Sequence, residues 1–535
     1  MSPPSVPPSA VSNDIGDIEK DMYSLRSSAA SPPALDPGPV PVKGIDAEVA
    51  EFFENTPDVE VVIDEKTNKR LRMMVHKRVL VIMVATYFLQ ALDKGTINFA
   101  SIMGIIEDTH LVGSQYSWLT TCVYIAILVW EFPTNRLIQR LPIAKYLGFN
   151  IVAWGAVLAC TAACNNFTGL VIVRTLLGIF ECVCQPTFVF LSTMWYTREE
   201  QGLAIGAFYA CNGFQQMVGG LIAYGVAQIQ HAAIKNWQIL FLMLGCITVA
   251  WGLFVVYWLP DSPMKAKCWS EEDKRLIAER VRKNQTGIQN KEFKMYQALE
   301  AIRDPTVWSV TLISFTNGLP TGGFGAFGNI IVKEFGFTQL QTYLLAIAQG
   351  AVIVTFLFSG VWLAKIYKQR LLVAFLYTLP NVAGTIVFLT VHISARTKVG
   401  LLLAFYCCNA FAAVATLNLA VMSGNVAGRT KQVISTTFIF VAWAVGNAIG
   451  PQVFISTDGP RYMKAWTTHI IIYAIQLATI VFLRARLMRL NVLKRRAQGL
   501  NESKVSGDMA DGEVSQANAF SDLTDQENPD FRYVY

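Results

Sequence analysis

The chain has 535 residues, of which 53% are hydrophobic and only 15% are charged. Soluble domains usually carry about 25% charged residues, so this composition argues against a soluble protein and indicates a chain that crosses a membrane several times. The net charge of +6 is too small to indicate nucleic-acid binding.

The first 75 residues are predicted to form a disordered cytosolic tail. They are rich in Pro, Ser, Asp and Glu, a composition that cannot bury an apolar core. A short amphipathic helix is expected near residues 51–72. No signal peptide is visible, because the first apolar run begins near Val79, so we expect the first span itself to act as the insertion signal.

Twelve apolar runs are long enough to cross a bilayer, whose core of about 30 Å needs about 20 helical residues. Six runs precede a polar stretch and six follow it. The predicted fold is therefore an all-α membrane protein with twelve transmembrane helices in two six-helix bundles, within residues 76–260 and 306–490. The predicted spans are 79–101, 114–136, 143–163, 168–192, 203–228, 237–259, 306–330, 341–364, 371–392, 400–422, 433–455 and 466–487.

The polar segments between and after the bundles set the predicted orientation. Residues 261–305 form a central loop with a charged helix, for which Ser270 is the expected N-cap, and residues 491–535 form a tail whose acidic, polar end is expected to be disordered. Lys and Arg gather in both of these segments and in the short loops on the same side. Since basic loops stay inside, both termini are predicted to be cytosolic.

The first span carries an adjacent pair of charges, Asp93 and Lys94, well inside its apolar run. A charged side chain at that depth costs roughly 2.5–3.5 kcal/mol on insertion scales. Such a pair is expected to face a water-filled cavity or a partner, and a purely structural ion pair is the alternative.

The fourth span, GLVIVRTLLGIFECVCQPTF, carries a second set of charges. Arg174, Gly178, Glu181 and Gln185 are spaced by 4, 3 and 4 residues, so they share one helix face. We expect this face to turn toward the charged pair of the first span. Two acids and two bases suit a proton-coupled anion carrier, since the bases hold a carboxylate and a partly desolvated acid can load and release a proton. A fixed salt-bridge network between the two spans is the alternative.

The seventh span contains the glycine-rich run NGLPTGGFGAFG at 317–328. Pro320 among these glycines predicts a broken or loosened helix. Interrupted helices in transporters often form gates or expose backbone to substrate. A packing kink without such a role is the alternative.

Both halves contain distinctive stretches of sequence. They include YFLQALDKGTINFASIMG in the first span, GIFECVCQPTFVFLSTMWYTREEQ in the fourth, WLPDSP at 258–263 and SGNVAGRTKQ at 423–432. These stretches resemble the fungal allantoate permease family, in the anion:cation symporter branch of the major facilitator superfamily. The resemblance covers about residues 75–490. The loops after the second and eighth spans depart from the superfamily pattern, because Gln139 and Ala364 stand where its acidic residue would be, so the usual gating ion pair is not expected.

The resemblance implies roles for the charged residues. Asp93 and Glu181 would be the proton sites, and Lys94 and Arg174 would bind the substrate carboxylate. The implied activity is uptake of a small organic anion with H+, such as a ureide, nicotinate, pantothenate or another carboxylate. The implied protein is a monomer of the plasma membrane that needs no cofactor.

Further polar residues on the spans are candidates for the substrate site, although each could instead make a helix–helix hydrogen bond. The serious rival to uptake is proton-driven export of a fungal secondary metabolite, and a nutrient sensor is a further alternative. The fifth span has glycines but lacks the proline of the drug-exporter signature. The absence of a GxxxxGK phosphate loop argues against an ATP-driven pump, and no residue cluster suggests an enzyme or a metal site. The additional candidates are Tyr124, Gln185, Asn212 and Asn447.

Overall fold

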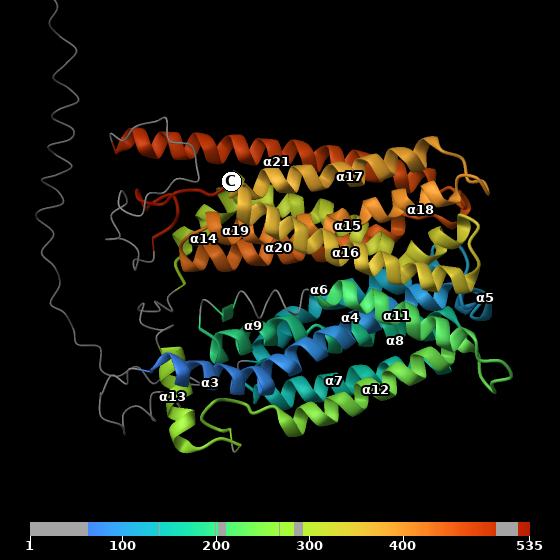
Figure 1. Cartoon of the computed structure of the whole chain (residues 1–535), viewed down its shortest axis with the longest axis horizontal. Helices are drawn as coiled ribbons and strands as arrows, with labels where there is room; N and C mark the ends of the chain where they lie inside the picture. Colours follow the sequence, from blue (N-terminus) through green and yellow to red (C-terminus); the bar gives the residue numbers. More distant parts are fainter. Residues whose placement is uncertain are drawn as a thin grey trace, which may run out of the picture. The chain divides into compact units, whose positions relative to one another are not determined.

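The structure is built from long helices that run side by side in two groups (Figure 1). Within the described part of the chain all regular secondary structure is helical, so the predicted all-α class is confirmed. The computed structural model describes residues 63–138, 140–197, 200–201, 210–266, 268–282, 293–498 and 523–535.

The first helix group contains the predicted spans of the N-terminal half. The fourth span consists of two helices, because α8 ends at Glu181 and α9 begins at Cys184. Gly178 explains how the second span approaches it, since a Cβ at this position would lie 2.5 Å from the carbonyl oxygen of Val123. The helices of this group are α4 (Val81–Ser101), α6 (Gln115–Ile138), α7 (Ile143–Cys160), α8 (Phe167–Glu181), α9 (Cys184–Trp195), α11 (Cys211–Ala227) and α12 (Asn236–Trp258).

The second helix group contains the spans of the C-terminal half. Its first helix, α15, is continuous through Pro320, so the predicted break in the seventh span is wrong. The glycines serve close packing instead, because a Cβ on Gly322 would lie 2.3 Å from the carbonyl oxygen of Asn447 on α20. The helices are α15 (Pro305–Glu334), α16 (Gln339–Tyr367), α17 (Arg370–Thr390), α18 (Lys398–Cys407), α19 (Phe411–Asn425), α20 (Arg429–Ile449) and α21 (Met463–Ala497).

Nine helical segments among the described residues are long and apolar enough to cross a membrane. The other three predicted spans correspond to α6, α11 and α15. Of these, α11 has only 17 described residues, and the predicted part at 203–209 lies outside the described ranges. The helices therefore follow the predicted plan of six spans in each half.

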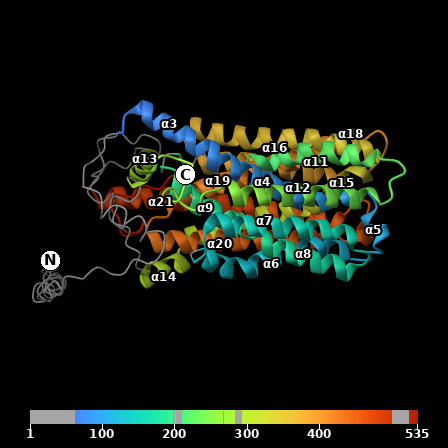
Figure 2. The ribbon, with the colours of Figure 1, turned by 90° about the horizontal axis from the view of Figure 1, so that it is seen from below.

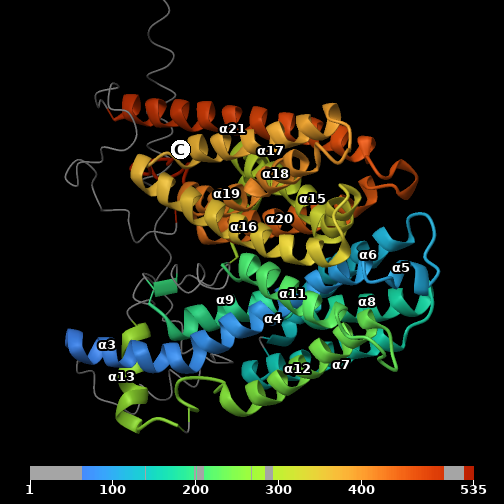
Figure 3. The same ribbon diagram turned by 45° about the vertical axis from the view of Figure 1, so that its right-hand side comes forward.

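The two groups touch through α11 against α16, α4 against α15 and α6 against α20. Hydrogen bonds join them near one end of the bundles. The Tyr116 hydroxyl donates to the carbonyl of Ala326 at 2.7 Å, and the backbone N–H of Asn329 donates to the side-chain oxygen of Asn98 at 2.9 Å. This end also carries the short helix α5 (Ile105–Asp108), which Figure 3 shows far from the C terminus.

The opposite end carries α3 (Glu65–Val75), α13 (Glu271–Arg282), α14 (Met295–Arg303) and the C terminus (Figure 2). Helix α13 begins as predicted, since the N–H of Asp273 donates to the hydroxyl of Ser270 at 3.2 Å. Helix α3 covers the end of the predicted amphipathic segment, whose residues 51–62 lie outside the described ranges. An ion pair of 2.6 Å between Arg70 and Asp273 joins α3 to α13.

Residues 523–535 pack against this end of the second group, so the expected disorder of the polar C-terminal end is wrong for these residues. The backbone of Tyr533 forms two hydrogen bonds of 2.8 Å with the side chain of Asn491. The backbone of Val534 pairs in the same way with Asn425, with two bonds of 2.7 Å. Composition did not reveal this packing, because single amide side chains on distant helices supply the partners.

Candidate functional site

A cavity of about 170 Å³ lies between the two helix groups. Its walls come from α4, α6, α8, α9 and α11 of the first group and from α15 and α20 of the second. At about 30 Å³ per water molecule in the liquid, this volume equals about six waters, which is the scale of a small molecule. The polar side chains that line it include Gln90, Lys94, Tyr124, Arg174, Gln185 and Asn212.

Helix α4 presents one face to the cavity. Tyr87, Gln90, Ala91, Lys94 and Gly95 all line it, and their spacing of i, i+3, i+4, i+7 and i+8 is that of one helical stripe. A glycine at the end of this stripe leaves space for a neighbouring side chain. The stripe therefore brings one cation, one amide and one phenol to the same wall.

The break in the fourth span lies behind this stripe. Helix α8 ends at Glu181, and the last carbonyls of a helix have no partner within the helix. The side chain of Gln90 donates to the Glu181 carbonyl at 3.0 Å. Gln90 thus links α4 to the end of α8 and fixes the position of Glu181 along the helix axis relative to Lys94.

Lys94 and Glu181 form an ion pair with 3.5 Å between the ammonium nitrogen and one carboxylate oxygen. The Glu181 side chain is fully buried, whereas the Lys94 side chain is 27% exposed. Neither carboxylate oxygen of Glu181 has a hydrogen-bond partner among the described residues. This acid is therefore held by charge attraction alone.

Arg174 reaches the cavity from α8, as the predicted face required. Its side chain is only 2% exposed, and its guanidinium carbon lies 5.3 Å from the ring centre of Phe241. Such cation–π contact stabilises the cation without neutralising it. Within the described chain, Nε and Nη2 of Arg174 have no hydrogen-bond partner.

Asp93 does not line the cavity, although we expected it to lie with Lys94 opposite the fourth span. Its carboxylate accepts hydrogen bonds from Trp154 Nε1 at 2.6 Å and from the Thr248 hydroxyl at 3.1 Å. These partners lie on α7 and α12. The reason is geometric, because successive residues of an α-helix point about 100° apart.

The neutral candidates fall into two sets. Tyr124, Gln185 and Asn212 line the cavity. The ring of Tyr124 meets Trp443 of the second group edge to face at 5.8 Å, so this pair spans the two halves. Asn447 is not among the lining residues, and its amide donates to the Trp443 carbonyl one turn earlier at 2.8 Å.

Sequence reasoning missed several lining residues, including Gln90, Thr321 and Trp443. Gln90 could have been found, because it lies four residues before Lys94 on the same helix face. Trp443 and Thr321 could not, since only the packing of the two groups brings α20 and α15 to the cavity.

Comparison with known proteins agrees with this architecture. Residues 83–451 match the family model of the Major Facilitator Superfamily. The chain belongs to this superfamily. It is 31% identical to the allantoate permease of Saccharomyces cerevisiae, over 91% of this chain and 90% of that protein. It is 34% identical to transporter C417.10 of Schizosaccharomyces pombe, over 94% and 95% of the two chains.

The fold of this superfamily member is also similar to solved transporter structures. The crystal structure of a D-xylose–proton symporter matches with a TM-score of 0.59 at 13% identity, over 76% of this chain and 97% of that chain. The resemblance to the allantoate permease family is thus confirmed. The protein is a multi-pass membrane protein and a secondary transporter of a small molecule, and it is not an enzyme.

Proposed function

We propose that this transporter carries a small organic anion together with protons. The observation that supports the proposal is the placement of two cations, Lys94 and Arg174, on one small cavity, with buried Glu181 at 3.5 Å from Lys94. Two cations on a cavity wall favour a carboxylate-bearing cargo, because charge-assisted hydrogen bonds are the strong ones.

Charge balance supplies the reason for coupling. With both acids ionised, the two cations balance Asp93 and Glu181. An incoming carboxylate adds one negative charge, and net charge is costly to hold in a site of low dielectric constant. A proton on Glu181 restores neutrality, so the anion and the proton favour each other's binding.

The same geometry suggests how the exchange occurs. Protonation of Glu181 removes the attraction that holds Lys94, because a neutral carboxyl no longer forms an ion pair. The ammonium is then available to the cargo carboxylate beside Arg174. Release of the cargo lets Lys94 return to Glu181 as the proton leaves.

The neutral residues of the site would set its selectivity. Tyr124, Gln185 and Asn212 present hydroxyl and amide groups to the cavity, which suit a cargo with polar groups besides its carboxylate. Asn447 as a substrate residue and Asp93 as a second proton site remain predictions. The hydrogen bonds of Asp93 to α7 and α12 favour a role in holding α4.

The cargo class rests on the relatives. One relative is an allantoate permease, and we infer a ureide, a vitamin such as nicotinate or pantothenate, or a similar carboxylate. We also infer a monomer in the plasma membrane with both termini cytosolic. The end of the bundles near α5 then lies outside, and the hydrogen bonds that join the halves there favour an inward-facing state.

The test is uptake by yeast cells that express the protein. Labelled allantoate, nicotinate, pantothenate, biotin and small dicarboxylates are offered at outside pH 5 and pH 7, with and without a protonophore. We expect one anion to accumulate faster at pH 5 and to lose accumulation with the protonophore. Surface expression without uptake of any anion, together with efflux from preloaded vesicles, would instead establish proton-driven export.

A further inference from the structure

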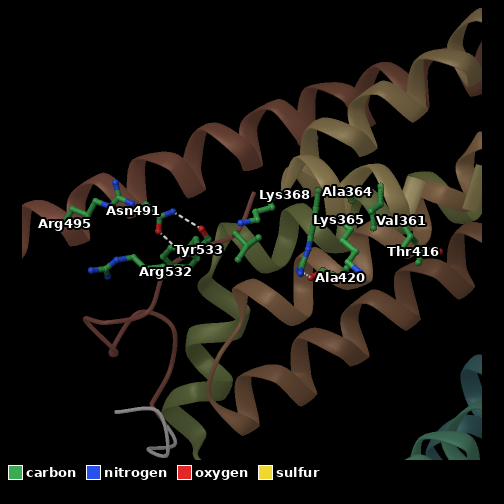
Figure 4. A pocket seen from close by; sticks show the side chains of 13 residues that line it. Val361, Ala364, Lys365, Lys368, Thr416, Ala420, Asn491, Arg495, Arg532 and Tyr533 are labelled. Atoms are coloured by element: carbon green, nitrogen blue, oxygen red, sulfur yellow. Dashed lines mark hydrogen bonds between the residues drawn. The ribbon is translucent and has the colours of Figure 1, made fainter. Parts of the chain in front are cut away.

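A second pocket, of about 530 Å³, lies at the end of the second helix group that carries the C terminus (Figure 4). It is about three times as large as the cavity between the halves. Its walls are the ends of α16, α17 and α21, the middle of α19, and the C-terminal segment at 523–535. It shares no lining residue with the substrate cavity, so the transport function does not account for it.

The lining of this pocket is strongly basic. Of the 13 described residues that line it, five are Lys or Arg and none is Asp or Glu. A pocket wall with this excess of one sign concentrates counter-ions of the opposite sign. The five cations are Lys365, Lys368, Arg370, Arg495 and Arg532.

The cations come from four separate elements, and the guanidinium groups of Arg370 and Arg532 are held by uncharged oxygens. Arg370 Nη1 donates to the carbonyl of Ala420 at 2.5 Å. Arg532 donates to the carbonyl of Pro529 at 2.8 Å and to the side-chain oxygen of Gln498. Carbonyl and amide oxygens orient a guanidinium but leave its charge in place, so these two cations remain positive inside the pocket.

The guanidinium groups of Arg495 and Arg532 act on each other at the wall formed by α21 and the C-terminal segment. Burial lowers the pKa of Arg532, and the nearby guanidinium of Arg495 lowers it further, whereas Asp530 opposes the change. Two guanidinium groups held near each other gain free energy when an anion bridges them. Arg495 and Arg532 both line the pocket and extend in the same direction in Figure 4.

The C-terminal segment is a fixed wall of this pocket. Tyr533 is 2% exposed and is anchored to Asn491 of α21 by the paired hydrogen bonds described above. The backbone N–H of Arg370 donates to a main-chain oxygen of Tyr535 at 3.1 Å. The segment thus joins α21 to α17 and adds Arg532 to the pocket that Lys365 and Lys368 also line.

We propose that this basic pocket binds a phosphate-bearing anion, through Lys365, Lys368 and Arg495 on the helices and Arg532 on the C-terminal segment. Phosphate oxygens accept several charge-assisted hydrogen bonds at once, which suits a pocket lined by several Lys and Arg side chains. On the inferred orientation the pocket lies at the cytosolic face. Basic pockets between transmembrane helices on that side bind anionic lipid headgroups, and soluble phosphate compounds offer the same chemistry.

The experiment uses the full chain, purified and placed in phosphatidylcholine nanodiscs. Binding of a fluorescent short-chain phosphatidylinositol bisphosphate is titrated, and inositol trisphosphate and inorganic phosphate are titrated separately. Binding of the lipid alone identifies a headgroup site. Binding of a soluble probe with equal affinity identifies a site for free phosphate compounds.

The pocket variant carries Lys365→Gln, Lys368→Gln and Arg495→Gln together. We expect each lost cation to weaken binding about fivefold, so the triple change weakens it about 100-fold. The control removes three exposed cations from the opposite end of the same helix group and should bind as the parent does. Its changes are Lys333→Gln, Arg396→Gln and Lys464→Gln.

Two results would overturn the proposal. One is that neither the lipid nor a soluble phosphate probe binds the parent protein. The other is that the pocket variant, with an unchanged thermal unfolding midpoint, binds as tightly as the control. If the triple variant fails to fold, Lys365→Gln alone decides, because Lys365 is exposed at the end of α16 and does not anchor the described C-terminal segment. A loss below about twofold contradicts the expected fivefold loss.

Discussion

Two buried clusters of charged side chains differ in how completely their members are paired. The Lys431 cluster lies where α20 begins, near α14 and the C-terminal segment. The ammonium of Lys431 is fully buried and donates to Glu300 at 2.8 Å, to Asp304 at 2.7 Å and to Asp525 at 2.7 Å. An ammonium has three N–H donors, and here each has a carboxylate.

The cavity cluster, which consists of Lys94, Arg174 and Glu181, is poorly satisfied. Arg174 and Glu181 are buried, whereas the Lys94 side chain is 27% exposed. Its one ion pair is 3.5 Å long, and both oxygens of Glu181 and two nitrogens of Arg174 have no hydrogen-bond partner among the described residues. Unsatisfied buried charge is costly, so a chain that keeps it uses it. The comparison separates charges that hold helices together from charges that are kept available for a ligand.

The largest effect is expected from breaking the saturated cluster with Lys431→Met. Removal of Lys431 takes the shared cation from three carboxylates, of which Asp304 keeps an ion pair with Arg486 at 3.3 Å. Breaking a buried ion pair in this way costs about 3–5 kcal/mol. The measurement is denaturant or thermal unfolding of the purified protein. Lys464→Met, at an exposed site, is the control and should stay within about 0.5 kcal/mol of the parent. Equal stability of the two variants would remove the distinction between the clusters.

The opposite pattern is expected for Arg174→Gln in the cavity cluster. Loss of the anion-binding cation should cost about 2–4 kcal/mol of cargo binding, or about 30- to 900-fold in uptake efficiency. Stability should be unchanged or raised, because an unsatisfied buried charge is removed. Uptake and unfolding are measured on the same variant. If the variant is less stable but each folded molecule still takes up cargo at the parental rate, Arg174 holds helices together as Lys431 does.

Asp93 is intermediate between the two clusters in how completely it is paired. One carboxylate oxygen accepts two hydrogen bonds, and the other has no partner in the described chain. Thr248→Val removes one of these bonds and should lower stability by about 1–2 kcal/mol. If Asp93 only holds α4, the pH dependence of uptake stays as in the parent. A shifted pH profile at constant stability would place Asp93 in the cavity cluster.

The smallest effect concerns pH and the Lys431 cluster. Burial raises the pKa of Asp304, but the Lys431 ammonium and the hydrogen bonds outweigh it, so the net pKa is lowered. A lowered folded-state pKa contributes stability above the unfolded-state value of about 3.9, and this stability is lost as the pH falls through the folded-state value. The free energy of unfolding is measured from pH 7 to pH 3 for the parent and for Asp304→Asn. The difference between the two should shrink only below about pH 4. A difference that shrinks between pH 7 and pH 5 would contradict this sign.

Much of the fold could be predicted from the sequence, because apolar length and the distribution of Lys and Arg are strong signals. The helix break at Glu181 and the continuous α15 were not foreseen. The break coincides with Pro186, which has no N–H to pair with the Cys182 carbonyl, and the Gln90 side chain pairs with the carbonyl of Glu181. The packing of α20 on Gly322 is a tertiary contact. The docked segment at 523–535 was missed because its polar composition resembles that of disordered chains.

The candidate site was predicted in part. Arg174 and Gln185, which were predicted to share one helix face, line the same cavity from α8 and α9, and Lys94, Tyr124 and Asn212 line it too. Glu181 of that predicted face is not among the described lining residues. Adjacent residues of a helix do not share a face, which is why Lys94 lines the cavity and Asp93 points to α7 and α12 instead. Contributions of the second half, such as Trp443, depend on how the halves dock and leave no signal in a single span.

The most direct test of the account is a pair of assays on Glu181→Gln in proteoliposomes. One assay measures accumulation of the cargo anion driven by a pH gradient, and the other measures exchange of internal for external cargo without a gradient. We predict that the variant loses gradient-driven accumulation and keeps exchange at a rate near the parental rate, because a permanently neutral side chain cannot cycle a proton but leaves Lys94 available to the anion. Parental accumulation under the pH gradient would contradict the assignment of Glu181 as the proton site.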